Sequence, residues 1–160
     1  MATTGQGALR LARIVALATP LALLGGAYLG QYGFGLYPCE MCWWQRYAHF
    51  AALGLAVAAL LLPRGRWLVV LAALAIAVSA AIGAFHAGVE YHWWQGLTAC
   101  STTAASGGDP LAAIMNAPLI RCDQAQWQLF GVSLAGWNFL FSGAAALAIG
   151  LLLRRAGDTR

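Results

Sequence analysis

Four cysteines are the residues of this chain most able to do chemistry, and they fall into two pairs. Cys39 and Cys42 form a Cys-Glu-Met-Cys motif, whereas Cys100 and Cys122 are 22 residues apart. Thiolates attack disulfides and bind soft metals, so paired cysteines suit either exchange chemistry or ligation. Arg46 follows Cys42 by four residues, which places its cation on the same face of a helix as that sulfur.

These two pairs have three interpretations. As a structural staple, a Cys100–Cys122 disulfide would stabilise the fold by about 3 kcal/mol, but a Cys-x-x-Cys pair closes too small a loop to do the same. As zinc ligands, the four cysteines lack the spacing of two paired knuckles. As redox pairs, a Cys-x-x-Cys motif at the start of a helix favours the thiolate through the helix N-terminus and a nearby cation. The redox interpretation is favoured, and the other two stay open.

The composition places this chemistry in a membrane. Of 160 residues, 61% are hydrophobic and 9% are charged, against about 45–50% and about 25% in a soluble domain. So few charges could not cover a soluble surface, which excludes an ordinary cytosolic enzyme, a nucleic-acid binder and a disordered chain. The net charge of +4 comes from scattered arginines, because the chain contains no lysine.

Long apolar stretches without Asp, Glu, Lys or Arg predict the elements that hold the cysteines. Each is close to the ~20 residues that a spanning helix needs. The sequence predicts an all-α membrane protein, a four-transmembrane-helix bundle that forms one membrane domain over residues 1–160. A cleaved signal peptide is the alternative for the first stretch, but no suitable cleavage site follows it. The spans expected around these stretches are Ile14–Gln31, Trp44–Leu62, Trp67–Ala87 and Val132–Leu153, and the second of them includes Arg46 and His49 in its first turns.

Arginine placement predicts the orientation of these spans. Seven of the nine arginines fall on one side, which the positive-inside rule makes cytoplasmic. Both termini are then cytoplasmic and all four cysteines lie on the outer side, Cys100 and Cys122 in a long loop over about residues 88–131. Within this loop, Asp109 and Pro110 predict the start of a short helix on the membrane surface, with an ordinary loop helix as the alternative. The seven arginines are Arg10, Arg13, Arg64, Arg66, Arg154, Arg155 and Arg160.

Two segments together resemble a known family. The run Cys39-Glu-Met-Cys42-Trp-Trp-Gln-Arg46 and the run from Cys122 to Gly131, with four spans and an outer cysteine pair, look like disulfide bond formation protein B (DsbB). The resemblance covers nearly the whole chain. It implies a protein of the bacterial inner membrane with periplasmic cysteines, in contact with lipid and with no nucleic-acid partner. It also implies that the protein reoxidises a periplasmic DsbA-type thiol oxidase and passes the electrons to membrane quinone, either ubiquinone or menaquinone.

The same resemblance assigns a role to each cysteine. It implies that Cys39 and Cys42 are the quinone-facing pair and that the sulfur of Cys42 contacts the quinone ring. Cys100 would form the mixed disulfide with DsbA, and Cys122 would be its partner.

Three further residues are implied to bind the quinone. Arg46 matches the family arginine needed for quinone use, and His86 matches a histidine of the quinone site. Glu90 stands where the family pattern has glutamine, which is a departure. Two other functions remain as alternatives: a vitamin K epoxide reductase-like protein, in which the Cys-x-x-Cys motif usually lies late in the chain, and a non-enzymatic membrane scaffold with structural disulfides.

Overall fold

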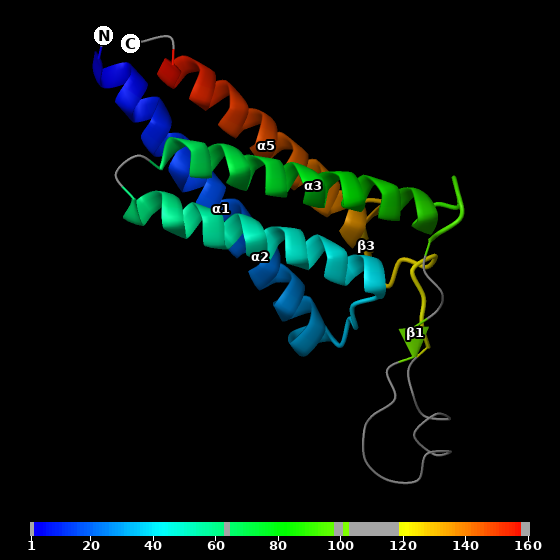
Figure 1. Ribbon diagram of the computed structural model, residues 1–160. Coiled ribbons are helices and arrows are strands. Elements are labelled where there is room, and N and C mark those ends of the chain that lie inside the picture. Colours follow the sequence, from blue (N-terminus) through cyan, green and yellow to red (C-terminus); the bar gives the residue numbers. More distant parts are fainter. Residues whose placement is uncertain (1, 63–64, 98–100, 103–118, 158–160) are drawn as a thin grey trace.

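Four helices form an elongated bundle in the computed structural model, which describes residues 2–62, 65–97, 101–102 and 119–157 (Figure 1). Helix α3 packs between α2 and α5, and α1 packs against α5 and α2. Alanines make up much of the buried core and let the helix backbones approach closely. The helices are α1 (Ala2–Phe34), α2 (Glu40–Leu61), α3 (Arg66–Glu90) and α5 (Leu134–Gly157).

A helix covers nearly all of each expected span, but the boundaries differ for identifiable reasons. Helix α2 begins earlier than expected because Cys39 caps it, and α5 begins at Leu134 because Val132 and Ser133 form a strand. Within the described residues, three helices are long and apolar enough to cross a membrane: Gly5–Phe34, Arg66–Glu90 and Leu134–Gly157. The protein is therefore a helical membrane protein.

Two short antiparallel hairpins, which the sequence did not predict, accompany the helices. Strand β1 (Ser101–Thr102) pairs with β2 (Leu119–Ile120), and β3 (Gln128–Leu129) pairs with β4 (Val132–Ser133). The expected surface helix near Asp109, like Cys100, lies outside the described residues.

The β3–β4 hairpin is tied to the end of α3. Phe130 (φ 53) and Gly131 (φ 75) turn the chain through two left-handed positions, which a type I′ hairpin requires. The hydroxyl of Tyr91 donates to the Gly131 carbonyl (3.1 Å) and accepts from the Ser133 N–H (2.9 Å). The end of α3 and the start of α5 are thereby joined directly.

Helices α3 and α5 approach each other closely at Gly83. A Cβ at this position would lie 2.9 Å from Asn138 Nδ2 and 3.0 Å from the Ala135 carbonyl oxygen, so only glycine permits the approach. This contact brings Asn138 of α5 against Ser79 of α3, where it takes part in the site described below.

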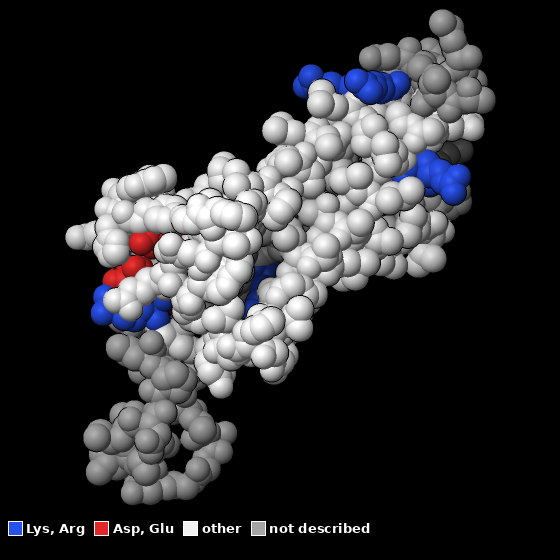
Figure 2. All heavy atoms as spheres, turned by 180° about the vertical axis from the view of Figure 1, so that it is seen from behind, with Lys and Arg blue, Asp and Glu red and all other residues white. Residues whose placement is uncertain are grey.

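The visible acidic side chains gather at one end of the bundle. Figure 2 shows them beside a further basic group, whereas other basic side chains lie at the opposite end. Arg66, at the start of α3, donates to the Leu153 carbonyl near the end of α5 (2.8 Å), so this opposite end is the one where α1 begins and α5 ends. The acidic end is the one that holds the cysteine motif.

Candidate functional site

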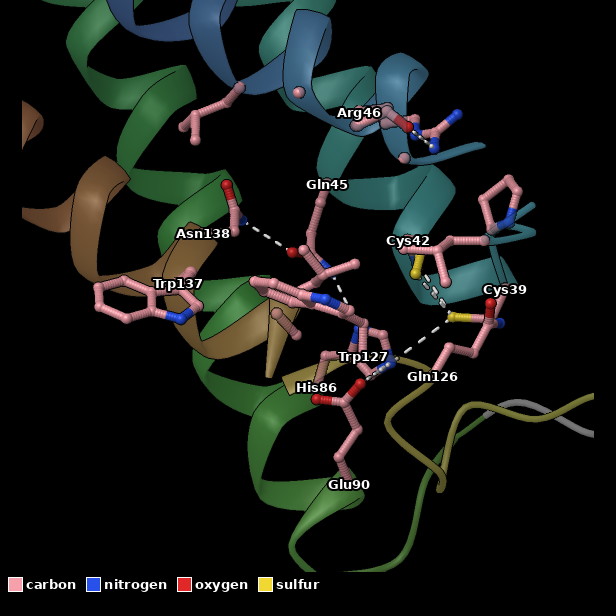
Figure 3. A pocket seen from close by; sticks show the side chains of 18 of the residues that line it. Cys39, Cys42, Gln45, Arg46, His86, Glu90, Gln126, Trp127, Trp137 and Asn138 are labelled. Atoms are coloured by element: carbon pink, nitrogen blue, oxygen red, sulfur yellow. Dashed lines mark hydrogen bonds and ion pairs between the residues drawn. The ribbon is translucent and has the colours of Figure 1, made fainter. Parts of the chain in front are cut away.

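A cavity of about 420 Å³ opens between all four helices and the segment that precedes α5. Its size falls in the range of small-molecule sites, about 300–1,000 Å³. Most of the exposed surface of its wall is apolar, and Figure 3 shows polar and sulfur-bearing side chains distributed along it. The polar and sulfur-bearing residues that line it include Cys39, Cys42, Gln45, Arg46, His49, His86, Glu90, Arg121, Gln124, Gln126 and Asn138.

The two cysteines of the motif meet at the first turn of α2. Cys39 is the N-cap residue, and its sulfur accepts a hydrogen bond from the backbone N–H of Cys42 (3.4 Å). The Cys39 thiol in turn donates to the Cys42 sulfur, and the two Sγ atoms are 3.1 Å apart. A thiol thus takes the capping role usually filled by a hydroxyl or a carboxylate. In this hydrogen bond Cys39 is the donor and Cys42 is the acceptor.

Cys122 packs in the same buried cluster as Cys39. The Cys39 and Cys122 sulfurs and the Nε2 atom of His86 all lie within 4.8 Å of one another, and all three residues are buried. Hydrogen bonding with Cys122, then with Cys42, and finally burial raise the pKa of the Cys39 thiol above its usual value. One sulfur of the outer pair therefore contacts the inner pair directly. Because Cys100 lies outside the described residues, its pairing with Cys122 stays a prediction.

His86 and Glu90 lie one turn apart on α3 and face the same sulfur cluster. The Nε2 atom of His86 is 3.5 Å from the Cys39 sulfur and 3.8 Å from Glu90 Oε1. The Oε2 atom of Glu90 is buried and has no hydrogen-bond partner among the described residues. Both side chains, which the sequence assigned only by resemblance, thus reach the cavity that contains Cys39 and Cys42.

Arg46 lines the cavity, and its guanidinium is held by groups of α1. Its guanidinium donates to Gln31 Oε1 (2.6 Å) and to the Ala27 carbonyl (3.2 Å), and it lies over the rings of Tyr28 (4.9 Å) and Trp43 (5.0 Å). Within the described part of the chain, these hydrogen bonds fix it to α1 and not to the motif. The cation is 6% exposed, so its field acts in a largely water-free wall of the cavity.

Sequence reasoning missed a buried polar network below the cysteines. Gln45 of α2 and Asn138 of α5 hydrogen-bond to each other (2.8 Å), and the network extends to His86, Ser79 and His49. Polar side chains inside apolar spans are usually functional or paired, and this was the available signal. Residues Gln45 and Asn138 are 93 positions apart, so no local motif links them.

The fold and the site together define a helical membrane protein with a buried thiol pair inside an apolar cavity. The family model described as "Disulfide bond formation protein DsbB" matches residues 9–152. The chain belongs to the DsbB family of disulfide bond formation proteins, whose name indicates a disulfide-forming oxidoreductase.

Curated relatives agree with this family. The chain is similar to proteins named "Disulfide bond formation protein B" from three bacteria. Identity is 33% with that of Acidovorax sp. (strain JS42), over 92% of this chain and 88% of the relative. It is 35% with that of Verminephrobacter eiseniae (strain EF01-2), over 94% and 89%, and 35% with that of Azoarcus sp. (strain BH72), over 81% and 83%. No solved structure matches the chain.

Proposed function

We propose that this protein is a thiol:quinone oxidoreductase that reoxidises a DsbA-type periplasmic thiol oxidase and passes the electrons to membrane quinone. The observation that carries the proposal is the contact of Cys122 with Cys39 in the apolar cavity that also holds Cys42. In this proposal all four helices cross the bacterial inner membrane, both termini are cytoplasmic, and the cysteines face the periplasm.

Redox potentials explain why thiol pairs need an apolar cavity. A DsbA-type oxidase has a potential near about −120 mV, whereas stable structural disulfides lie below about −300 mV. An ordinary disulfide would therefore not reoxidise it. A quinone supplies the missing driving force, because when bound it accepts two electrons and two protons. The cavity fits such a ring through its volume, its apolar wall and the buried donors Arg46 and His86.

The proximity of Cys122 to Cys39 supports the following order of exchange. A thiolate of the reduced partner attacks Cys100 of a Cys100–Cys122 disulfide, and Cys122 leaves as a thiolate. The partner's second thiolate then closes its own disulfide and releases Cys100. Cys122 attacks the neighbouring Cys39 of a Cys39–Cys42 disulfide, so that Cys42 leaves as the thiolate next to the ring. The Cys100 thiolate then attacks Cys122 in the Cys122–Cys39 disulfide and releases Cys39 as a thiolate. The Cys100–Cys122 disulfide is thereby restored, and Cys39 and Cys42 hold the two electrons.

A quinone-reduction assay tests the proposal. Reduced DsbA-type oxidase should drive rapid reduction of ubiquinone or menaquinone by the purified protein in lipid, and comparing the two shows which is used. A protein that binds the partner without reducing either quinone would instead be a membrane scaffold. Quinone reduction by small thiols alone, with no gain from the partner, would favour the vitamin K epoxide reductase-like alternative.

The proposed orientation predicts the outcome of reporter fusions. A reporter that is active only in the periplasm should be silent when fused after Arg160 and active when inserted near Gly107. The reason is that basic residues are retained on the cytoplasmic side. The reverse pattern would place the cysteines in the cytoplasm and contradict both the topology and the function.

Arg46→Gln should impair quinone use without impairing disulfide exchange. Loss of a charged hydrogen-bond donor costs about 1.5–3 kcal/mol, which corresponds to an apparent KM for quinone raised about 10- to 100-fold. Arg46→Lys should recover part of this loss, since it keeps the charge but not the planar fork that spans Gln31 and Ala27. Single-turnover exchange between the partner and Cys100–Cys122 is the control. Equal loss of both half-reactions would show that Arg46 serves the fold only.

A further inference from the structure

The buried network below Cys39 has a fixed hydrogen-bond direction. Asn138 Nδ2 lies 3.1 Å from the Ser79 carbonyl oxygen, and a carbonyl oxygen only accepts. The amide nitrogen of Asn138 must therefore point toward the Ser79 carbonyl, and the same NH₂ group also donates to Gln45 Oε1 (2.8 Å). The Asn138 oxygen correspondingly accepts from His49 Nε2 (2.9 Å) and from the Ser142 hydroxyl (3.0 Å).

The orientation of Gln45 is fixed twice. Its oxygen accepts from Asn138, and its nitrogen lies 3.1 Å from the Met41 carbonyl oxygen, which again only accepts. The second N–H of this amide points at His86 Nδ1, 3.0 Å away. Nδ1 is therefore the acceptor of the pair. A neutral imidazole has one donor and one acceptor nitrogen, so the proton of His86 lies on Nε2.

We propose that Gln45, held by Asn138, is a positioning residue that keeps His86 in the neutral Nε2–H tautomer, with this N–H directed at the Cys39 sulfur. His86 then acts as a hydrogen-bond donor that is shared between the Cys39 sulfur (3.5 Å) and the backbone of Cys122, and as neither a base nor a metal ligand. The tautomer is independent of the proposed function, and only the use made of it rests on that function. In that use, the N–H stabilises the Cys39 thiolate when Cys39 gives up its proton to re-form the disulfide with Cys42.

The same geometry explains why three good metal donors need not form a metal site. Cys39, Cys122 and His86 place two sulfurs and Nε2 within 4.8 Å, which suits zinc or cadmium by donor type. A metal-binding histidine, however, donates its other N–H to an acceptor in the surrounding shell. Here the surrounding group is a donor, the N–H of Gln45, so Nε2 keeps its proton and cannot ligate. The network thus protects a thiol site from the metals that its sulfurs attract.

Nitrogen NMR of the histidine rings tests this directly. The full-length protein, reduced and labelled with ¹⁵N-histidine in lipid nanodiscs, should show His86 protonated on Nε2, with its signal assigned by its loss in His86→Gln. Gln45→Glu replaces the donor by an acceptor of the same shape and should move the proton to Nδ1. Ser142→Ala is the matched control: it removes a polar group of the same network but leaves the direction of the Gln45 amide unchanged, so His86 should stay protonated on Nε2.

Cadmium titration of the same reduced proteins gives a second measurement. Gln45→Glu should bind Cd²⁺ about 10- to 100-fold more tightly than wild type, and adding His86→Gln should remove this gain. The inference is overturned if wild-type His86 is protonated on Nδ1, if Gln45→Glu leaves the tautomer unchanged, or if His86 already contributes to Cd²⁺ affinity in wild type. The wild-type spectrum decides the matter even if Gln45→Glu does not fold. Neither measurement uses quinone or the partner, so failure of the proposed function would leave this result standing.

Discussion

Replacing Cys42 by serine should abolish turnover with quinone and remove the visible charge-transfer absorption that a thiolate gives with a bound quinone. Cys42 is the sulfur that accepts the hydrogen bond of the Cys39 thiol, and it lies one turn inside α2 on the wall of the cavity. A thiolate at this position is an electron donor next to an electron-poor ring. The measurement is an absorption spectrum of the quinone-loaded protein together with the quinone-reduction rate.

Cys39→Ser is the matched control for this experiment. It should keep or increase the colour, because Cys42 can then no longer be consumed in a disulfide with Cys39. The colour should fade as the pH falls, since a thiol is a much weaker donor than a thiolate. An absorption that persists in Cys42→Ser would reject this assignment and identify Cys39 as the quinone-facing sulfur.

Cys122→Ser should stop electron flow from the partner while leaving the quinone colour intact. Cys122 is the described sulfur of the outer pair and lies close to Cys39, so in the proposed exchange it connects the outer pair to the inner pair. Without it, the partner's thiolate has no resolving sulfur, so we expect a stable mixed disulfide between Cys100 and the DsbA-type protein. Non-reducing electrophoresis would show this complex as a band that disappears with reductant.

The same substitution at the other cysteine of the pair, Cys100→Ser, identifies which sulfur the partner's thiolate attacks. It should accumulate little of the mixed disulfide, because Cys122 is buried against Cys39 and is 6% exposed. A complex that forms equally well or better in Cys100→Ser would mean that the partner attacks Cys122.

The sequence predicted what local patterns and composition control. Apolar stretches placed the helices, and the Cys39–Cys42 motif marked the start of α2 because spacing along one helix is a local property. The start of the last helix was missed because a local contact decided it: Val132 and Ser133 pair as a strand, so α5 begins only at Leu134.

Contacts between distant segments were beyond reach of the sequence. The orientation of Arg46 depends on acceptors in α1, and the direction of the Gln45 amide depends on a carbonyl of α3 that acts through Asn138. Neither follows from spacing along one helix, because packing decides which groups meet. Resemblance to a family brought His86 and Glu90 into consideration, whereas the packed structure was needed to bring them to the sulfurs.

The hydroxyl of Tyr91 has a consequence for how such proteins diverge. By joining the end of α3 to the β3–β4 hairpin, it holds together the two points between which the chain leaves and re-enters the bundle. Once the ends of a loop are held, each doubling of its length costs only about 0.6 kcal/mol. The length of the chain between these two points can therefore change at little cost in stability, while the frame formed by α3 and α5 stays constant.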